Sequence, residues 1–289
     1  MYGVICDEQL NVVHRRAETI EEIYPFRGSK YVQSNTAFTY QQVFQDLKNG
    51  KEVLYSGTPC QIAGLLKFLE RKKLDCSDMG KLFTVDTLCH GVPSLKTLHA
   101  YVREVEEQEN IIVKKVRFRD KRTGWQNYSI VLETSEGEKS CDANHDAYML
   151  AFRRDLSLRQ SCYNCKFKLG KKEIWSDLTL GDFWGVGREF HEYADDDKGI
   201  SWITVHSQKG ARWFAEIEEQ LYIREVDISI PLRNNTSASK PAIKPKRRDR
   251  FFSDVNSGKE FSKTTMICAG ETGIEGLIRK TKRILKKAY

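Results

Sequence analysis

Two cysteines occupy matching positions in two successive strand-turn-helix units of this 289-residue chain. Cys60 stands in SGTPCQIAGL and Cys89 in DTLCHGVPS, each just after a short apolar run that is typical of a buried strand. Parallel neighbouring strands bring their carboxyl ends to one sheet edge, so we expect both cysteines on the same rim. A separate Cys-x-x-Cys, formed by Cys162 and Cys165, supplies two more thiols. The pattern predicts that four thiolates meet at one metal centre.

The helix that follows the first strand has a clear start signal. Thr58 is a good N-cap, Pro59 suits the first helical position, and Gln61 completes a capping box. Cys60 would therefore lie in the first turn, where free backbone N–H groups and the positive end of the helix dipole favour a thiolate. In the second unit, residues 82–88 read as the strand and Ser94 as the helix cap.

Alternatives stay open for these thiols. A single free cysteine is more often a small buried hydrophobe than a ligand. A tetrathiolate site holds either zinc or an iron–sulfur cluster, and one Cys-x-x-Cys plus two isolated cysteines mildly favours the cluster. We expect the four other cysteines to be structural or exposed, and not part of a disulfide framework: Cys6, Cys76, Cys141 and Cys268.

Hydrophobic periodicity predicts an α/β (α+β) fold, in which parallel βα units are joined to an antiparallel meander. The first expected elements are a hairpin over 1–16, a helix over 39–48, the two βα units to about 108 and the meander over 111–141. They are followed by a helix over 143–160, a strand that runs into a tight turn at 181–185, a strand over 199–206, a helix over 211–220, a last strand over 221–227 and an irregular link over 233–254. We expect a catalytic domain over 1–230 and a basic, partly irregular extension over 231–289.

The net charge of +7 is concentrated late in the chain, at 244–250 and 279–287. Basic segments invite acidic partners, and a basic amphipathic helix after Gly276 would suit peripheral contact with an anionic membrane. The plain alternative is a solvated tail. No segment resembles a nucleic-acid-binding module, and neither a secretory signal nor a transmembrane run is present, so we expect a cytoplasmic protein that does not bind nucleic acid.

Several motifs together resemble one known family. In order along the chain they are GSKYVQS (28–34), SGTPCQIAGL, DTLCHGVPS, FRDKRTGW (118–125), SCYNCKF (161–167) and LTLGDFWG (178–185). They are similar to the coenzyme F420 hydrogenase/dehydrogenase beta-subunit family. The resemblance implies an oxidoreductase with FAD beside a [4Fe-4S] cluster. Electrons would come from a ferredoxin or partner redox subunit and leave to a small-molecule hydride acceptor, F420 or another. Cys60, Cys89, Cys162 and Cys165 are the implied cluster ligands.

A flavin needs polar and cationic groups for its phosphates and donors near its ring. The residues that the resemblance and this chemistry single out as cofactor-binding are Ser29, Lys30, Tyr31, Gln33, Ser34, Thr58, Gln61, His90, Arg119, Lys121, Trp125 and Asp182. His90 is also the catalytic candidate, because histidine titrates near neutral pH and can relay a proton. The plain alternatives are a surface turn at 28–31, helix capping at Thr58 and Gln61, and a charged hairpin tip at 117–125.

Many members of the family carry ferredoxin-like cysteine motifs ahead of the first hairpin, whereas this sequence starts at Met1 without them. We therefore expect electrons to arrive from a separate protein. The rival interpretations are a non-catalytic zinc-binding interaction protein and a truncated, inactive homologue.

Overall fold

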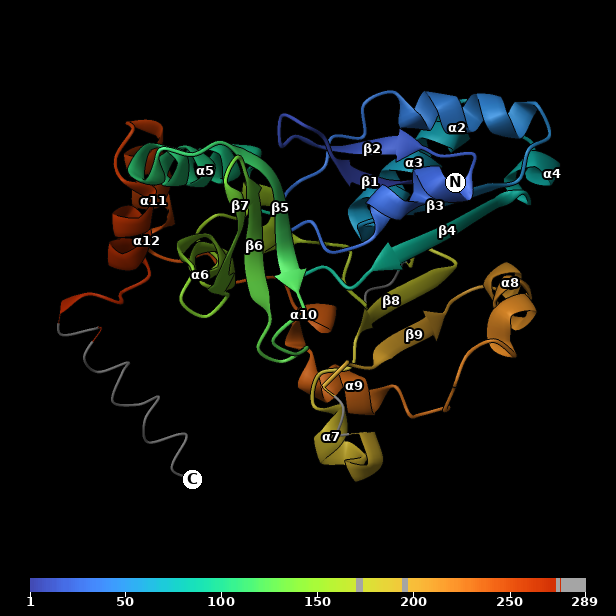
Figure 1. Cartoon of the computed structure of the whole chain (residues 1–289). Coiled ribbons are helices and arrows are strands. Elements are labelled where there is room, and N and C mark those ends of the chain that lie inside the picture. Colours follow the sequence, from blue (N-terminus) through green and yellow to red (C-terminus); the bar gives the residue numbers. More distant parts are fainter. Residues whose placement is uncertain (170–173, 194–196, 274–275, 277–289) are drawn as a thin grey trace.

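The computed structural model describes residues 1–169, 174–193, 197–273 and 276, and it contains two sheets (Figure 1). The larger sheet has six strands in the order β2-β1-β3-β4-β8-β9, and the smaller has three in the order β5-β6-β7. Parallel and antiparallel pairs coexist in the larger sheet, while the smaller is a meander. The predicted α/β (α+β) class is confirmed.

The centre of the large sheet is the predicted pair of parallel strands. β3 (Val53–Gly57) runs alongside β4 (Leu82–Thr87), so both strands end at the same edge. The remaining strands are β1 (Tyr2–Cys6), β2 (Val12–Arg16), β8 (Leu178–Asp182) and β9 (Ser201–Val205). β1 and β2 form the predicted hairpin, β8 lies parallel to β4, and β9 is antiparallel to β8.

Helices cover both faces of this sheet. α2 (Thr39–Lys48) and α3 (Pro59–Arg71) bury their apolar side chains against β3 and β4, with Tyr55 and Leu82 fully buried between them. Successive strand residues point to opposite faces. Phe83 therefore points the other way, and it stacks on Trp213 of α8 (Gln208–Glu218) with ring centroids 4.6 Å apart.

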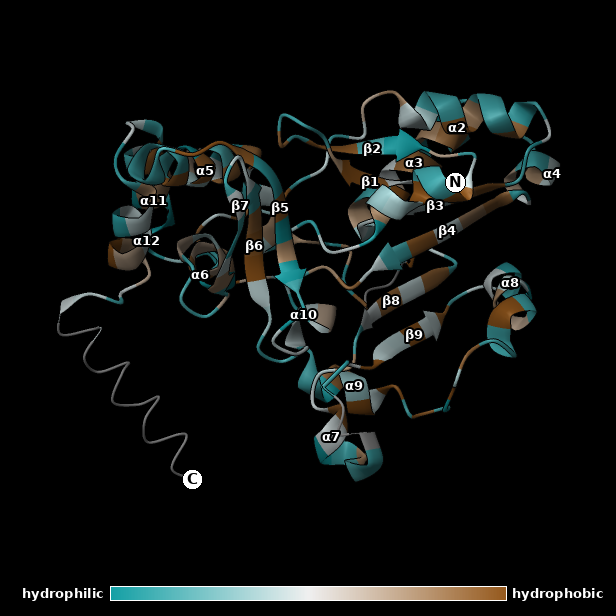
Figure 2. Ribbon diagram, viewed as in Figure 1, coloured by the Kyte–Doolittle hydropathy of each residue, from teal (hydrophilic) through white to brown (hydrophobic). Residues whose placement is uncertain are grey.

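The smaller sheet belongs to a second core. Its strands are β5 (Val113–Asp120), β6 (Ser129–Thr134) and β7 (Gly137–Asp142), and the apolar β6 appears brown in Figure 2. The helices packed with it are α5 (Leu95–Glu109), α6 (Ala147–Arg153), α11 (Arg248–Asn256) and α12 (Phe261–Cys268). Phe251 and Phe261 are buried in this core, so the C-terminal helices are part of the folded body.

Three local expectations are wrong. The stretch 233–254 is not an irregular link, because it contains most of α11, the end of α9 (Ser229–Asn234) and α10 (Thr236–Ser239), anchored by buried Ala238 and Phe251. The helix expected over 143–160 is only α6, which Asp146 caps and which ends before Asp155, a residue with φ +60°. The structure has no strand over 221–227.

Six short elements complete the described chain: α1 (Ile20–Ile23), η1 (Tyr24–Phe26), α4 (Cys76–Met79), η2 (Gln160–Asn164), α7 (Val186–Glu189) and η3 (His191–Tyr193). The basic segment 279–287 and its expected amphipathic helix lie outside the described residues. Within the described part, no helix is both long and apolar enough to span a bilayer.

Candidate functional site

The first cysteine lies where the sequence places it. α3 begins at Pro59 after Thr58, and the Thr58 N–H donates to Gln61 Oε1 at 3.0 Å, which confirms the predicted cap. Cys60 is exposed in the first turn, with its Sγ 3.2 Å from Thr58 Oγ1. The thiol is therefore held next to a hydroxyl at the carboxyl edge of the sheet.

The second cysteine, Cys89, follows β4 at the same edge and is set deeper. The pKa of its thiol is raised to about 12, chiefly by burial; Lys168 opposes the rise, and the charges of Cys60, Cys162 and Cys165 contribute to it. The four cysteines therefore lie close enough for their charges to interact with Cys89. We call these four residues the cysteine centre. A thiol with such a pKa stays protonated at neutral pH unless a cation takes the place of its proton.

Backbone pairing brings the Cys-x-x-Cys pair to this edge. The N–H of Arg159 donates to the carbonyl of Val92 at 3.0 Å, and Pro93 forms an isolated β-bridge with Leu158. A Cβ added to Gly91 would lie 2.7 Å from a Leu158 methyl carbon and 3.4 Å from the Cys162 Cβ. The loop after Cys89 can thus approach Cys162 closely because residue 91 has no side chain.

The four cysteines of the cysteine centre lie in one region of the fold, but their side chains do not form a ready-made metal site. Among the described residues, no group of three or more His, Cys, Asp or Glu side chains is close enough to hold a metal ion. The donor set itself, four sulfurs, is the one that iron–sulfur clusters and structural zinc use. The chemistry of the residues fits either group, whereas their spacing here is that of four separate thiols.

A groove with a volume of about 780 Å³ adjoins Cys60. We call it the Gln61 groove. Its lining residues are Asp7, Asn11, Val12, Val13, Gln33, Ser34, Asn35, Thr36, Tyr40, Cys60, Gln61, Ser94, Leu95, Lys96, Arg159 and Ser161. The volume lies within the range of about 300–1,000 Å³ that is usual for organic ligands. Gln33, Ser34 and Gln61 are thus brought together beside a cysteine, and Gln61 Nε2 donates to Ser34 Oγ at 2.8 Å.

The turn at 28–31 does not reach this groove. Lys30 Nζ donates to the carbonyls of Pro25, Phe26 and Arg27 at 2.8–2.9 Å, so the ammonium closes its own turn. Burial lowers the pKa of Lys30 to about 8. Ser29 is exposed next to it.

Tyr31 packs into the core of the smaller sheet. Its ring stacks on Phe152 at 4.8 Å, and its carbonyl accepts a hydrogen bond from the Tyr148 hydroxyl at 2.7 Å. Tyr31 therefore joins the 28–34 segment to α6.

A second cluster gathers three more of the predicted residues. Arg119 forms an ion pair with Asp182, and Trp125 Nε1 donates to the other oxygen of Asp182 at 3.4 Å. The guanidinium lies over the rings of Tyr128 and Trp184, 4.9 and 5.1 Å from their centroids. We call these five residues the Arg119 cluster. It joins the end of β5 to the end of β8, and thus one sheet to the other.

Lys121 lies outside this cluster. Its Nζ donates to the carbonyl of Lys198 at 2.9 Å, and its side chain is exposed. The structure therefore gives it a loop contact rather than a place beside the Arg119 cluster.

His90 has both ring nitrogens engaged. Nε2 lies 2.5 Å from Asp155 Oδ1 and Nδ1 lies 2.9 Å from Ser237 Oγ. The ring also meets Phe152 edge-on at 5.3 Å. His90 is therefore fixed between the cysteine loop, the end of α6 and α10.

Sequence reasoning missed three cations. Lys168 Nζ donates to the carbonyls of Cys89 and Ser237, which ties the Cys-x-x-Cys segment to the second cysteine loop. Lys96 and Arg159 line the Gln61 groove. The sequence could have indicated Lys168, because it lies three residues after Cys165. No sequence pattern indicates Lys96 or Arg159, because these two residues come near each other only when the chain folds.

Comparison with known proteins gives one clear assignment. No curated protein sequence matches the chain. Among solved structures, a chain of the F420-reducing [NiFe] hydrogenase complex from Methanosarcina barkeri is similar, with a TM-score of 0.49 and 16% identity over 94% of this chain and 81% of that one. Residues 50–230 match the family described as the C terminus of the coenzyme F420 hydrogenase/dehydrogenase beta subunit. This match spans more than half of the sequence and includes the cysteine centre and the Arg119 cluster. The chain therefore belongs to the coenzyme F420 hydrogenase/dehydrogenase beta-subunit family.

Proposed function

We propose that the chain is an iron–sulfur flavoprotein module that passes electrons from a one-electron donor to an organic hydride acceptor. The observation that carries this proposal is the position of Cys60, which lines the Gln61 groove and whose charge acts on Cys89 together with those of Cys162 and Cys165. The chain's membership of the coenzyme F420 hydrogenase/dehydrogenase beta-subunit family supports a redox role. Two centres of different electron capacity, placed side by side, are what such a converter needs.

The proposed cluster ligands are Cys60, Cys89, Cys162 and Cys165. A [4Fe-4S] cluster supplies single-electron transfer at a potential that the surrounding hydrogen bonds and burial set. The chain's own contribution is to present sulfur donors whose protons leave only in favour of a metal, since the pKa values of the Cys89 and Cys162 thiols are raised by burial. Lys168 holds the Cys89 loop through its carbonyl.

The proposed flavin contacts are Gln33, Ser34, Thr58 and Gln61, which lie in or next to the Gln61 groove. FAD supplies two-electron chemistry when bound. The amide of Gln61 is already oriented by Ser34 and by the Thr58 N–H, so ordering this side chain should cost little conformational entropy when a ligand binds.

The residues farther from the groove take supporting roles in this proposal. Arg119, Trp125 and Asp182 form a rigid wall between the sheets, and Lys121 fixes the adjoining loop. Three others, Ser29, Lys30 and Tyr31, shape the segment that leads to Gln33.

His90 is the proposed proton-handling residue. Asp155 Oδ1 accepts from Nε2 and so favours a proton on that ring nitrogen. Exchange of a proton at Nδ1 would require Ser237 Oγ to rotate away. The finer assignments stay predictions: a ferredoxin or partner subunit as donor, F420 or another acceptor, a cytoplasmic location, contact of the basic end with a membrane, and domains over 1–230 and 231–289.

The experiment is an anaerobic visible spectrum of the purified chain with iron, sulfide, zinc and flavin measured on the same sample. The proposal expects about four irons and four sulfides, as one cubane cluster contains, and FAD close to stoichiometric. Cys162→Ser should lower the iron content and bleach the broad absorbance. Cys141→Ser is the matched control, because Cys141 is exposed on β7, away from the cysteine centre.

Each other outcome is informative. Stoichiometric zinc without flavin would support the tetrathiolate interaction protein instead. A colourless protein that stays so after anaerobic reconstitution with iron, sulfide and FAD would support an inactive homologue. Equal iron in both cysteine variants would refute Cys162 as a ligand.

A further inference from the structure

We propose that Lys96 and Arg159 form the anion-binding end of the Gln61 groove and hold the diphosphate of a dinucleotide cofactor. The inference rests on the proposed flavin function and goes beyond it, because it assigns the phosphate contacts to residues outside the motifs that carry the family resemblance. Neither residue was among the candidates taken from the sequence.

The two cations that line the groove come from different parts of the fold. Lys96 lies in the first turn of α5, close after the cap residue Ser94, and Arg159 lies three residues before Cys162. Both side chains are exposed and line the groove. Within the part of the chain that the structure describes, no ion pair or side-chain hydrogen bond engages either one. Two cationic groups are therefore available to a ligand.

The groove offers little negative charge in return. The one carboxylate among its described lining residues is Asp7, whose Oδ1 accepts the N–H groups of Gln9 and Asn11 at 3.0 and 2.8 Å. Asp7 thus satisfies its own turn. Ser94 and Ser161 add hydroxyl groups beside the cations. A diphosphate is the anionic group of a dinucleotide that such a set of donors suits.

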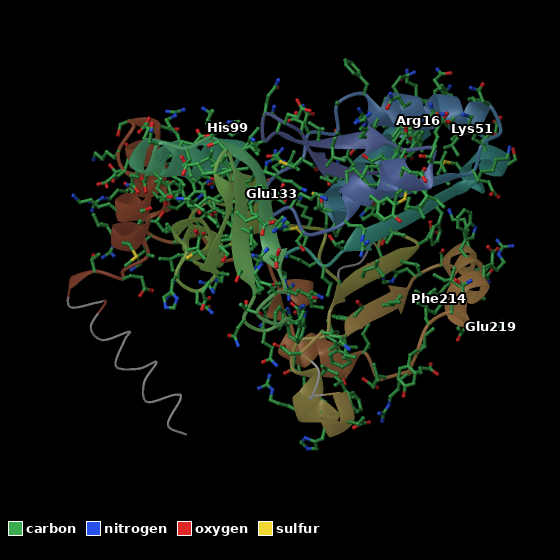
Figure 3. The ribbon with its side chains drawn as sticks, viewed as in Figure 1. Arg16, Lys51, His99, Glu133, Phe214 and Glu219 are labelled. Atoms are coloured by element: carbon green, nitrogen blue, oxygen red, sulfur yellow. The ribbon has the colours of Figure 1, made fainter. Side chains whose placement is uncertain are left out.

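Other cations are less suitable for this role. Lys30, one of the cationic cofactor-binding candidates taken from the sequence, has its three donors directed at carbonyls. Arg16 and Lys51, labelled in Figure 3, are paired with acids: Arg16 with Asp46 at 2.7 Å and Lys51 with Glu18 at 3.1 Å. Recruiting any of these would cost an existing interaction, whereas Lys96 and Arg159 lose only water.

The proximity of Arg159 to the cysteine centre adds a second reason. Arg159 and Cys60 line the same groove, and Arg159 lies three residues before Cys162. A ligand phosphate at Arg159 would therefore lie close to the cysteine centre, which is where a redox cofactor must sit to exchange electrons.

The test compares two ligands that contain a diphosphate, FAD and ADP, with one that contains no phosphate, riboflavin. Binding of FAD, riboflavin and ADP is measured by fluorescence and by calorimetry on wild type and on the double variant Lys96→Gln/Arg159→Gln. We expect the double variant to bind FAD and ADP at least about tenfold more weakly, since each charge-assisted hydrogen bond is worth about that factor. Riboflavin, which has no phosphate, should bind within about twofold of wild type. Lys114→Gln, an exposed cation on β5 outside the groove, should change none of the three affinities.

The outcomes separate this inference from the function on which it rests. If FAD binds the wild type and the double variant equally, Lys96 and Arg159 are not the diphosphate site and the flavoprotein assignment stands. Equal loss of FAD and riboflavin in the double variant would also overturn the inference, because the effect would not depend on phosphate. If the wild type binds no flavin, ADP decides alone: binding that the double variant loses supports the anion site, and no binding overturns it.

Discussion

Replacing Asp86 with asparagine should change how the stability of the chain depends on pH. Asp86 lies on β4 with 3% of its surface exposed, and its Oδ1 accepts a hydrogen bond from Thr179 Oγ1 at 2.7 Å. Burial raises the pKa of this carboxyl from 3.8 to about 6, while the hydroxyls of Thr179 and Ser176 hold it from rising further. At 1.36 kcal/mol per pH unit, the shift of roughly two units corresponds to about 3 kcal/mol.

The sign of this pH dependence follows from which state, folded or unfolded, binds the Asp86 proton more tightly. The folded chain binds the Asp86 proton better than the unfolded chain does, so this stabilisation is complete below about pH 4 and lost as pH rises through 6. Asparagine cannot ionise. Between pH 4 and 7, the free energy of unfolding of Asp86→Asn should therefore gain about 3 kcal/mol relative to wild type.

A second buried group acts in the opposite direction over the same pH range. Burial lowers the pKa of His14 from 6.5 to about 4, so the stabilisation that this neutral ring contributes is present above pH 6.5 and lost as pH falls through 4. The two effects oppose each other in wild type. Asp86→Asn removes the one that lowers stability as pH rises, so the stability of the variant should rise more with pH than that of wild type.

The assay is urea unfolding followed by circular dichroism at pH 4, 5, 6 and 7, with cofactor content matched between samples. Glu136→Gln, which removes an exposed carboxylate from the β6–β7 turn, is the control and should run parallel to wild type. Parallel curves for wild type and Asp86→Asn would refute the reasoning, since they would mean that Asp86 titrates alike in both states.

Three further predictions concern packing. Phe251→Ala, at a residue with 0% exposure, should lower the free energy of unfolding by about 3–5 kcal/mol in urea, and a loss under about 1 kcal/mol would show that α11 is dispensable. Gly199→Ala should cost about 1–3 kcal/mol and alter tryptophan fluorescence, because residue 199 has φ +86° and its new Cβ would lie 2.5 Å from the Trp125 ring; an unchanged spectrum would contradict this. Arg119→Lys should lower the free energy of unfolding by about 1–2 kcal/mol although the charge is kept, because lysine stacks less well than arginine on aromatic faces. Lys121→Met, which removes an exposed charge, is the control. A salt-sensitive loss of the same size in this control would show that charge, and not stacking, explains the effect.

The two βα units could be predicted because their signals are local. Thr58, Pro59 and Gln61 state where α3 begins, and alternating or continuous apolar runs mark β3 and β4. The convergence of Cys60 and Cys89 on one edge followed from the parallel pairing of those strands. The spacing of these residues was sufficient to predict that both cysteines lie at one edge, because a parallel sheet allows few other arrangements of two successive βα units.

Other features depend on contacts between distant segments, which no local pattern encodes. The stretch 233–254 looks irregular because its Pro, Ser and Lys content disfavours helices. Phe251 nevertheless packs on Phe261 of α12, in a core to which α6 also contributes. The run 221–227 has the composition of a strand, but a strand forms only when an edge is available to pair with it. The contacts of Lys30 likewise depend on folding, since its ammonium donates to three carbonyls that no local pattern singles out.

The order in which the cysteine centre is assembled has a consequence for biosynthesis. Cys60 and Cys89 leave the ribosome several seconds before Cys162 and Cys165, at usual rates of about 5–20 residues per second. During that interval the first two thiols have no partners, and the exposed Cys60 is open to oxidation. Only after the segment before Cys162 pairs with the loop after Cys89 can all four sulfurs meet. A metal held by all four thiols could therefore be bound only after Cys165 has been translated, while β8, β9, α11 and α12 are still to be made.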